Sequence, residues 1–176
     1  MKVGILILII FILTSCNKTV STPHEVTGTL FPKVNGTSLS GEARIIPDDY
    51  RGRYVIVLVG YLQDAQFDID RWILGLLQLG IKTEIIELPA IAGMMPRAVQ
   101  GYIDDGMRSG IPSEDWGTLI TIYEDADKII NSFGNEKAKN ANVFLLNKSG
   151  EVIWFTNRGY SASQVLSLKE KLTVQP

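Results

Sequence analysis

The stretch Arg53-Tyr54-Val55-Ile56-Val57-Leu58-Val59 is a nearly continuous run of β-branched and aliphatic residues. A run of this kind is typical of a strand that is buried on both faces of a sheet. The sequence then changes to a helical period. Apolar residues recur at i, i+3, i+4, i+7 and i+8, at Ile69, Trp72, Ile73, Leu76 and Leu77. This spacing predicts a helix with one face on the core, and the pair of elements indicates an α/β fold.

Strand and helix patterns continue to alternate toward the C-terminus. We expect strands over 81–88 and 118–123, with a helix between them that starts after Pro96. The apolar positions that mark this helix are Val99, Tyr102, Ile103 and Met107. A short helix that Gly134 ends is predicted to follow the second of these strands.

The last part of the chain predicts a hairpin and a helix. Apolar runs at 143–146 and 151–155 flank the turn-forming residues 147–150, which is typical of a β-hairpin. Ser161 and Gln164 form a capping-box pattern before the final helix. The element order predicts a mostly parallel central sheet, with the hairpin as an antiparallel edge and helices on both faces. We expect 32–47 to add a small strand or hairpin at the other edge.

Composition limits the possible functions. The chain has 176 residues, 17 basic against 19 acidic, and 45% hydrophobic residues, which favours one compact domain over a disordered chain. Its formal net charge of -2 does not favour nucleic-acid binding, which usually needs a basic surface. The single cysteine excludes a disulfide-rich scaffold.

The N-terminus has the pattern of an export signal. Met1-Lys2 gives a positive start, and the apolar run from Val3 to Leu13 is too short to span a bilayer. The following Leu13-Thr14-Ser15-Cys16 resembles the lipobox of bacterial lipoproteins. An ordinary signal peptide with an incidental cysteine is the alternative interpretation.

The lipobox resemblance implies a covalent anchor. It implies cleavage before Cys16, with diacylglycerol on its sulfur and an acyl chain such as palmitate on its amine. Two or three acyl chains anchor a protein stably. Residues 1–15 are then a signal peptide, 16–30 a flexible lipidated tether, and 31–176 the folded domain. In enterobacterial lipoproteins an aspartate directly after the cysteine favours retention in the inner membrane. This chain has Asn17 at that position, so the resemblance implies attachment to the outer membrane, facing the periplasm.

The layout of the domain resembles the thioredoxin-like superfamily, in its periplasmic thiol-oxidoreductase and peroxiredoxin-type branch. The resemblance covers residues 31–173 and lies in the segments 34–60, 120–134 and 144–153. In that family a reactive cysteine stands between the first buried strand and its helix. In this chain the corresponding stretch, 61–68, contains no cysteine. We therefore exclude dithiol exchange and cysteine peroxidase chemistry, and the soft ligands for copper delivery are also missing.

The polar residues of this stretch are candidate binding residues: Gln63, Asp64, Gln66 and Asp68. The simpler interpretation is that Asp64 caps the helix and that Asp68 interacts with its dipole. The alternative is that they line a cleft that remains where the reactive cysteine would be. We add Asn142, since Ala141-Asn142 replaces the proline that faces this cysteine in the family. Arg108 and Trp116 are further candidates because they border a loop.

No catalytic or metal site can be assigned from the remaining residues. The only histidine, His24, falls in the predicted tether, and the acidic pairs lack calcium-loop spacing. We expect no cofactor or metal beyond the lipid on Cys16.

Two functions from different classes remain open. The first is a membrane-anchored, redox-inactive thioredoxin-like lipoprotein that binds or helps to assemble another cell-envelope protein. The pattern 141–172 also resembles thioredoxin-like assembly factors of mitochondrial ATP synthase, which suggests the same role. The alternative is a thiol-independent enzyme or small-ligand binder that uses the acidic and amide residues of 63–68. A structural protein of the envelope without a ligand is a third possibility.

Overall fold

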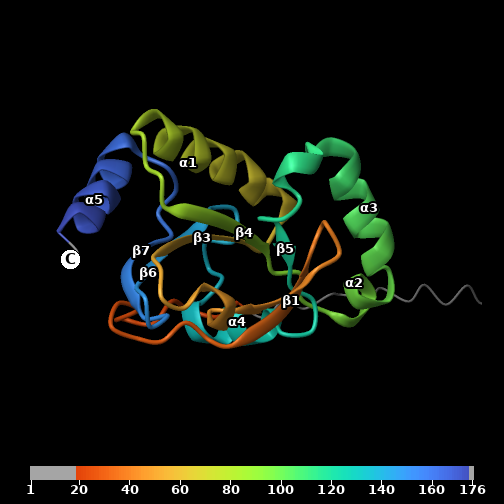
Figure 1. Ribbon diagram of the computed structural model, residues 1–176. Coiled ribbons are helices and arrows are strands. Elements are labelled where there is room, and N and C mark those ends of the chain that lie inside the picture. Colours follow the sequence, from red (N-terminus) through yellow and green to blue (C-terminus); the bar gives the residue numbers. More distant parts are fainter. Residues whose placement is uncertain (1–18, 175–176) are drawn as a thin grey trace, which may run out of the picture.

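The computed structural model describes residues 19–174 (Figure 1). The strands are β1 (Val34–Ser38), β2 (Ala43–Ile46), β3 (Val55–Gly60), β4 (Glu84–Pro89), β5 (Ile120–Thr121), β6 (Asn142–Leu146) and β7 (Val152–Thr156). The helices are α1 (Gln66–Gln78), α2 (Met94–Ala98), α3 (Gln100–Gly110), α4 (Ala126–Phe133) and α5 (Ala162–Thr173). Three short 3₁₀ helices are η1 (Asp48–Tyr50), η2 (Gln63–Ala65) and η3 (Ser113–Asp115). None of the helices between residues 19 and 174 is long and apolar enough to cross a bilayer.

The strands form two sheets that join through isolated bridges. One sheet has the order β2-β1-β5 and the other has the order β4-β3-β6-β7. Glu87 pairs with Leu119 and Ala90 pairs with Ile122, both in parallel, so β5 runs beside β4. The predicted hairpin at the N-terminal edge is confirmed as β1 and β2. The strand predicted over 118–123 is present but has shortened to β5 with flanking bridges.

The sheet is mixed, whereas the sequence predicted a mostly parallel one. β3 is parallel to β4 but antiparallel to β6, and β6 is antiparallel to β7. β1 is antiparallel to both of its neighbours. After α4, the non-helical stretch 134–141 returns the chain to the carboxyl end of β3. β6 begins at this end and therefore runs antiparallel to β3. The hairpin therefore contributes two antiparallel pairs rather than one.

Helices cover both faces of the sheet, as predicted. Alternate residues of β3 face opposite cores: Val55 and Val57 pack on the side of α4, and Ile56 and Leu58 pack on the side of α1 and α5. In Figure 1, α1 and α5 lie above the sheet and α4 lies below it. Trp72 of α1 is fully buried and meets Trp154 and Tyr160 edge to face. The predicted buried run, amphipathic helix and fold class are thus confirmed. Leu77 is the exception in the helix: it was predicted to face the core but is 59% exposed, since it lies at the margin of the apolar face.

The N-terminal segment is packed on the domain from Val20 onward, so the predicted flexible tether over 16–30 is wrong for most of its length. The amide N–H of Val20 donates to Asn135 Oδ1 at 2.7 Å. Gly28 donates to the carbonyl of Val152 at 2.8 Å, and Val26 is buried. These backbone contacts reach residues more than a hundred positions away, and no local pattern shows them. Cys16 and the signal sequence lie outside the described residues.

The helix predicted after Pro96 is two short helices. α2 and α3 meet at Val99, and neither contains a buried residue. Ile103 and Met107 are half-buried, whereas Val99 and Tyr102 are exposed. The apolar period therefore marks a surface on part of α3 rather than a core face.

Candidate functional site

The loop between β3 and α1 occupies the carboxyl end of the central strand. β3 ends at Gly60, the chain passes through Tyr61 and Leu62, and η2 leads directly into α1. Ligand sites in open α/β sheets often lie at the carboxyl ends of strands. Leu62 and Phe67 flank the polar residues of this loop and are 45% and 74% exposed. The loop thus presents apolar and polar groups together to solvent.

Gln63 and Asp64 are exposed at the start of η2. Asp64 does not cap either helix: no side-chain cap hydrogen bond is formed at the start of η2 or of α1. Its carboxylate instead lies 3.4 Å from Lys139 Nζ, with both side chains largely exposed. An exposed pair of this kind adds little stability. The prediction that Asp64 is a helix cap is therefore wrong, and its carboxylate is accessible.

Gln66 connects the loop to the carboxyl group of Glu87, which was not among the residues predicted from the sequence. Its side-chain amide donates to Asp70 Oδ1 at 2.9 Å and to Glu87 Oε2 at 3.3 Å. Glu87 lies on β4, and burial raises the pKa of its carboxyl group, with Asp70 and Asp115 adding to the effect and Gln66 opposing it. A charged residue between Ile86 and Leu88 in a strand was the one signal that could have identified it.

Asp68 is a structural residue rather than part of a binding surface. It is 3% exposed, and its two carboxylate oxygens accept hydrogen bonds from the backbone N–H groups of Ala141 at 3.0 Å and Tyr160 at 2.8 Å. Arg71 Nη2 lies 3.3 Å from the same carboxylate. Asp68 thereby ties α1 to the start of β6 and to the loop before α5. The candidate role in ligand binding does not fit this arrangement.

Asn142 is buried beneath the same end of the sheet. Its side-chain amide donates to the hydroxyl of Tyr61 at 3.2 Å. Burial raises the pKa of the Tyr61 hydroxyl, an effect that the hydrogen bond from Asn142 opposes. Tyr61 follows β3 directly, so this hydrogen bond connects the start of the β3–α1 loop to β6. Asn142 acts here as a support for the candidate site.

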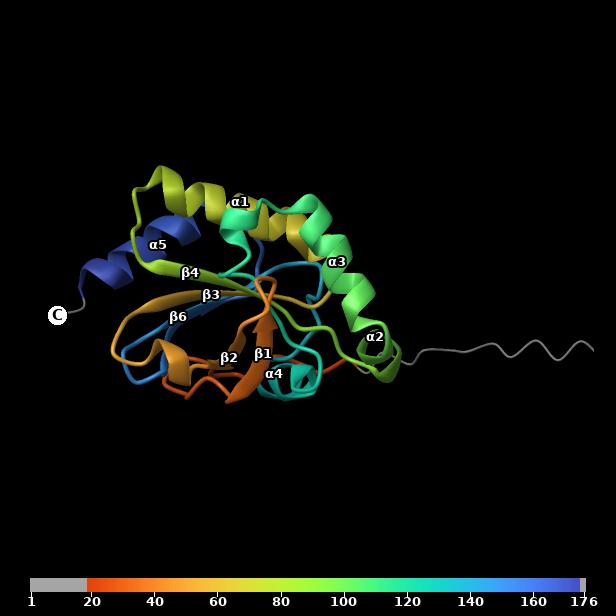
Figure 2. The same cartoon turned by 45° about the vertical axis from the view of Figure 1, so that its right-hand side comes forward.

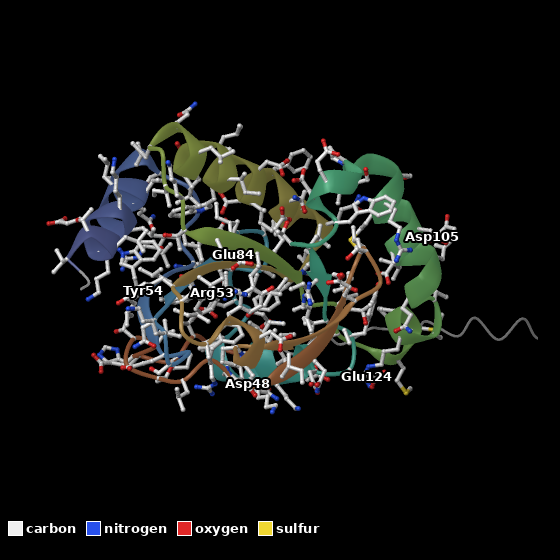
Figure 3. The ribbon with its side chains drawn as sticks, in the orientation of Figure 1. Asp48, Arg53, Tyr54, Glu84, Asp105 and Glu124 are labelled. Carbon is white, nitrogen blue, oxygen red and sulfur yellow. The ribbon has the colours of Figure 1, made fainter. Side chains whose placement is uncertain are left out.

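Arg108 of α3 lies next to Trp116, which follows η3. The guanidinium carbon of Arg108 is 6.0 Å from the centre of the Trp116 ring. Arg108 Nε donates to the carbonyl of Leu39 at 2.8 Å, and Nη1 pairs with Asp105, whose position on α3 is labelled in Figure 3. The indole N–H of Trp116 donates to the carbonyl of Ile111. These contacts fasten α3 to the N-terminal hairpin.

A cavity of about 550 Å³ lies in a different place, between the N-terminal segment and β7. His24 lines it together with Glu136, Trp154 and Arg158. Glu136 also accepts hydrogen bonds from the N–H and the hydroxyl of Thr22. Burial alone would raise the pKa of its carboxyl group, but these hydrogen bonds, together with Lys137, bring the pKa below the usual value. Among residues 19–174, no group of three or more His, Cys, Asp or Glu side chains could hold a metal ion.

Solved structures identify the fold. A pneumococcal exposed lipoprotein thioredoxin from Streptococcus pneumoniae is 12% identical, with a TM-score of 0.56, and covers 79% of this chain and 99% of its own. Copper-bound yeast Sco1 is also 12% identical with a TM-score of 0.56, covering 84% and 95%. BsSco, a member of the Sco family of cytochrome c oxidase assembly proteins, is 9% identical with a TM-score of 0.59, covering 89% and 100%.

The likeness is one of structure alone. No protein-family model matches the sequence, and no curated protein matches it either. The structural neighbours show that the chain has a thioredoxin-like fold. Residues 19–174 contain no cysteine, so the fold carries no thiol at the loop between β3 and α1.

Proposed function

We propose that the protein is a lipid-anchored, redox-inactive thioredoxin-like lipoprotein that binds or helps to assemble another protein of the cell envelope. The anchor is diacylglycerol and an acyl chain on Cys16, and the location is the outer membrane, facing the periplasm. The partner-binding surface is the exposed part of the β3–α1 loop: Leu62, Gln63, Asp64 and Phe67. We call these four residues the loop surface.

The observation that carries this proposal is the exposure of Phe67 on the first turn of α1. Its side chain is 74% exposed, beside the half-exposed Leu62 and the accessible carboxylate of Asp64. Aromatic anchors with polar neighbours are the groups that dominate binding energy at protein interfaces. A catalytic thiol is missing at this place, so the loop surface can recognise a partner without exchanging disulfides with it.

The structural neighbours support the same reading. One is named an exposed lipoprotein, and another belongs to a family of cytochrome c oxidase assembly proteins. These names describe proteins at the envelope or in assembly, with the same fold.

Crosslinking in native membranes tests the loop surface. Phe67→Ala is compared with Leu77→Ala, which truncates another exposed apolar residue of α1, 59% exposed and outside the loop surface. We expect a partner that is captured by wild type and by Leu77→Ala and lost with Phe67→Ala. Equal capture by all three proteins would place the binding surface elsewhere. Failure of wild type to capture any protein would overturn the proposed role in assembly.

The anchor has its own test. The mature N-terminus is analysed by mass spectrometry, and membrane association is measured for wild type and Cys16→Ser. We expect a mature chain that begins at acylated Cys16, and a soluble or unprocessed Cys16→Ser protein. An unmodified Cys16 would contradict the proposed anchor and leave the loop surface untouched.

A thiol-independent enzyme or small-ligand binder is the second candidate, and Glu87 is the observation that favours it. Its carboxyl group has a raised pKa and lies 3.3 Å from Gln66, next to the exposed loop. A partly buried carboxyl group with a raised pKa can act as a general acid or base. If this candidate is right, Glu87→Gln abolishes turnover or weakens ligand binding, whereas the exposed Glu114→Gln does neither.

A further inference from the structure

The beginning of α2 and α3 carries an exposed apolar surface. Met94, Met95, Val99 and Tyr102 are 83%, 74%, 44% and 84% exposed. We call these four residues the α2–α3 surface. The segment that leads into it, 88–96, reads Leu-Pro-Ala-Ile-Ala-Gly-Met-Met-Pro and contains no charged residue. An exposed apolar patch of this kind marks an interaction with a protein or a membrane.

The α2–α3 surface lies close to the place where the chain enters the domain. Arg97 of α2 donates to the carbonyl of Glu124 and lies 3.6 Å from Asp127, at the first turn of α4. At the other end of α4, Val20 and Asn135 exchange two hydrogen bonds. α4 has eight residues and is therefore about 12 Å long. In both ribbon views the first described residues and α2 lie on the same side of the molecule (Figures 1 and 2).

The packed N-terminal segment brings an anchored domain close to its membrane. Cys16 precedes Val20 by four residues, and four residues span at most about 14 Å. A lipid on Cys16 would therefore hold the start of the folded domain at the bilayer surface. A tether of 15 residues, which the sequence predicted, would have left the orientation of the domain free.

We propose that the α2–α3 surface docks on the bilayer that holds the lipid anchor. This inference rests on the proposed lipidation of Cys16. Tyrosine is enriched at membrane interfaces, and uncharged apolar side chains enter the acyl boundary without the cost of burying a charge. The charged residues around it are the acidic Asp104, Asp105 and Glu124 and the basic Arg97 and Arg108. Both arginines pair with acidic side chains, and Figure 3 shows Asp105 and Glu124 on this side of the molecule. The docking is therefore apolar, and it does not depend on anionic lipid.

Depth-dependent quenching tests the proposal on the full lipidated protein. Met95→Cys introduces a unique free thiol, because the lipid occupies Cys16. A fluorophore on this thiol is compared with one at Leu166→Cys, an exposed position on α5, 55% exposed and across the sheet from α4. Each protein is reconstituted in phosphatidylcholine vesicles that carry a quencher on the acyl chains. We expect several-fold stronger quenching at position 95 than at position 166, unchanged when phosphatidylglycerol is added.

The other outcomes separate this proposal from the anchor itself. Equal, weak quenching at both positions in protein that floats with the vesicles would overturn the docking and leave the anchor intact. Protein that stays soluble in flotation would overturn the anchor and the docking together. The label at position 95 could also become shielded from solvent only when other membrane proteins are added. This result would overturn the docking, because the α2–α3 surface would then bind a protein and not the bilayer.

Discussion

The carboxylate of Asp68 lies 3.0 Å from the backbone nitrogen of Ala141, which is 73 residues further along the chain. Its second oxygen accepts from the backbone of Tyr160 at 2.8 Å, 92 residues away. One buried side chain of α1 thus satisfies backbone donors in two segments that lie far away in the sequence. A buried N–H without a partner costs free energy, so Asp68 stabilises the junction of α1, β6 and α5.

Asp68→Ala is expected to lower the free energy of unfolding by about 2–5 kcal/mol, because it leaves two backbone N–H groups without an acceptor. Urea unfolding at neutral pH measures the effect. Asp64→Ala is the matched control, since Asp64 is 61% exposed and has one exposed ion pair. We expect it to change stability by less than about 0.5 kcal/mol. Similar small effects of both substitutions would contradict the structural role of Asp68.

Gly36→Ala is expected to destabilise the pairing of β1 with β5. A Cβ atom at this position would lie 2.5 Å from Ile122 Cδ1 and 2.9 Å from the carbonyl oxygen of Thr121. The backbone oxygen cannot move without disturbing the strand pair, so the cost is about 1–3 kcal/mol. Gly106→Ala on α3 meets nothing within 4 Å and should stabilise by about 0.5–1 kcal/mol through helix propensity. Thermal unfolding of the two variants should therefore shift in opposite directions.

The fold was predictable where local patterns determine it. The buried run of β3, the helical stripe of α1 and the turn at 147–150 each depend on neighbours in the sequence, and all three elements form. The direction of β6 was not predictable, since it depends on the route of 134–141, which has no periodic pattern. The packing of Val20 and Gly28 was missed for the same reason: their partners are Asn135 and Val152.

For the candidate site, the sequence predicted where its residues lie, and their role in binding stays a prediction. The resemblance placed it between β3 and α1, and the accessible residues Gln63 and Asp64 are found there. The role of Asp68 could not be inferred, because its partners are backbone atoms far away in the chain. Glu87 was missed because a single acidic residue in a strand does not indicate which helix will cover it.

Glu87 predicts a specific pH dependence of stability. Burial raises the pKa of its carboxyl group above the ordinary value of 4.5 in the folded state. The folded protein therefore binds this proton more tightly than the unfolded chain does. The contribution of Glu87 to stability is present below pH 4.5 and is lost as the pH rises through its folded pKa.

Glu87→Gln removes this titration while keeping the shape of the side chain. The difference in unfolding free energy, variant minus wild type, should increase between about pH 4.5 and neutral pH and stay constant at lower pH. Urea unfolding at several pH values measures it, with the exposed Glu114→Gln as the control. A pH-independent difference for Glu87→Gln would show that its carboxyl group titrates alike in the folded and unfolded states.

Hydrogen exchange distinguishes a packed N-terminal segment from a flexible tether. The amide of Gly28 donates to Val152 at 2.8 Å, and the amide of Val152 donates back to Thr29 at 2.8 Å. These two bonds attach the segment to β7, and the buried ring of Phe31 packs against Phe133 and Phe144. We expect the Gly28 amide to exchange at least ~100-fold more slowly than in an unstructured peptide, because the segment must detach before exchange occurs.

Phe31→Ala should accelerate this exchange by removing the buried ring beside Phe133 and Phe144. If the wild-type Gly28 amide exchanges as fast as in an unstructured peptide, the segment is a long flexible tether. The lipid anchor would then leave the orientation of the domain free.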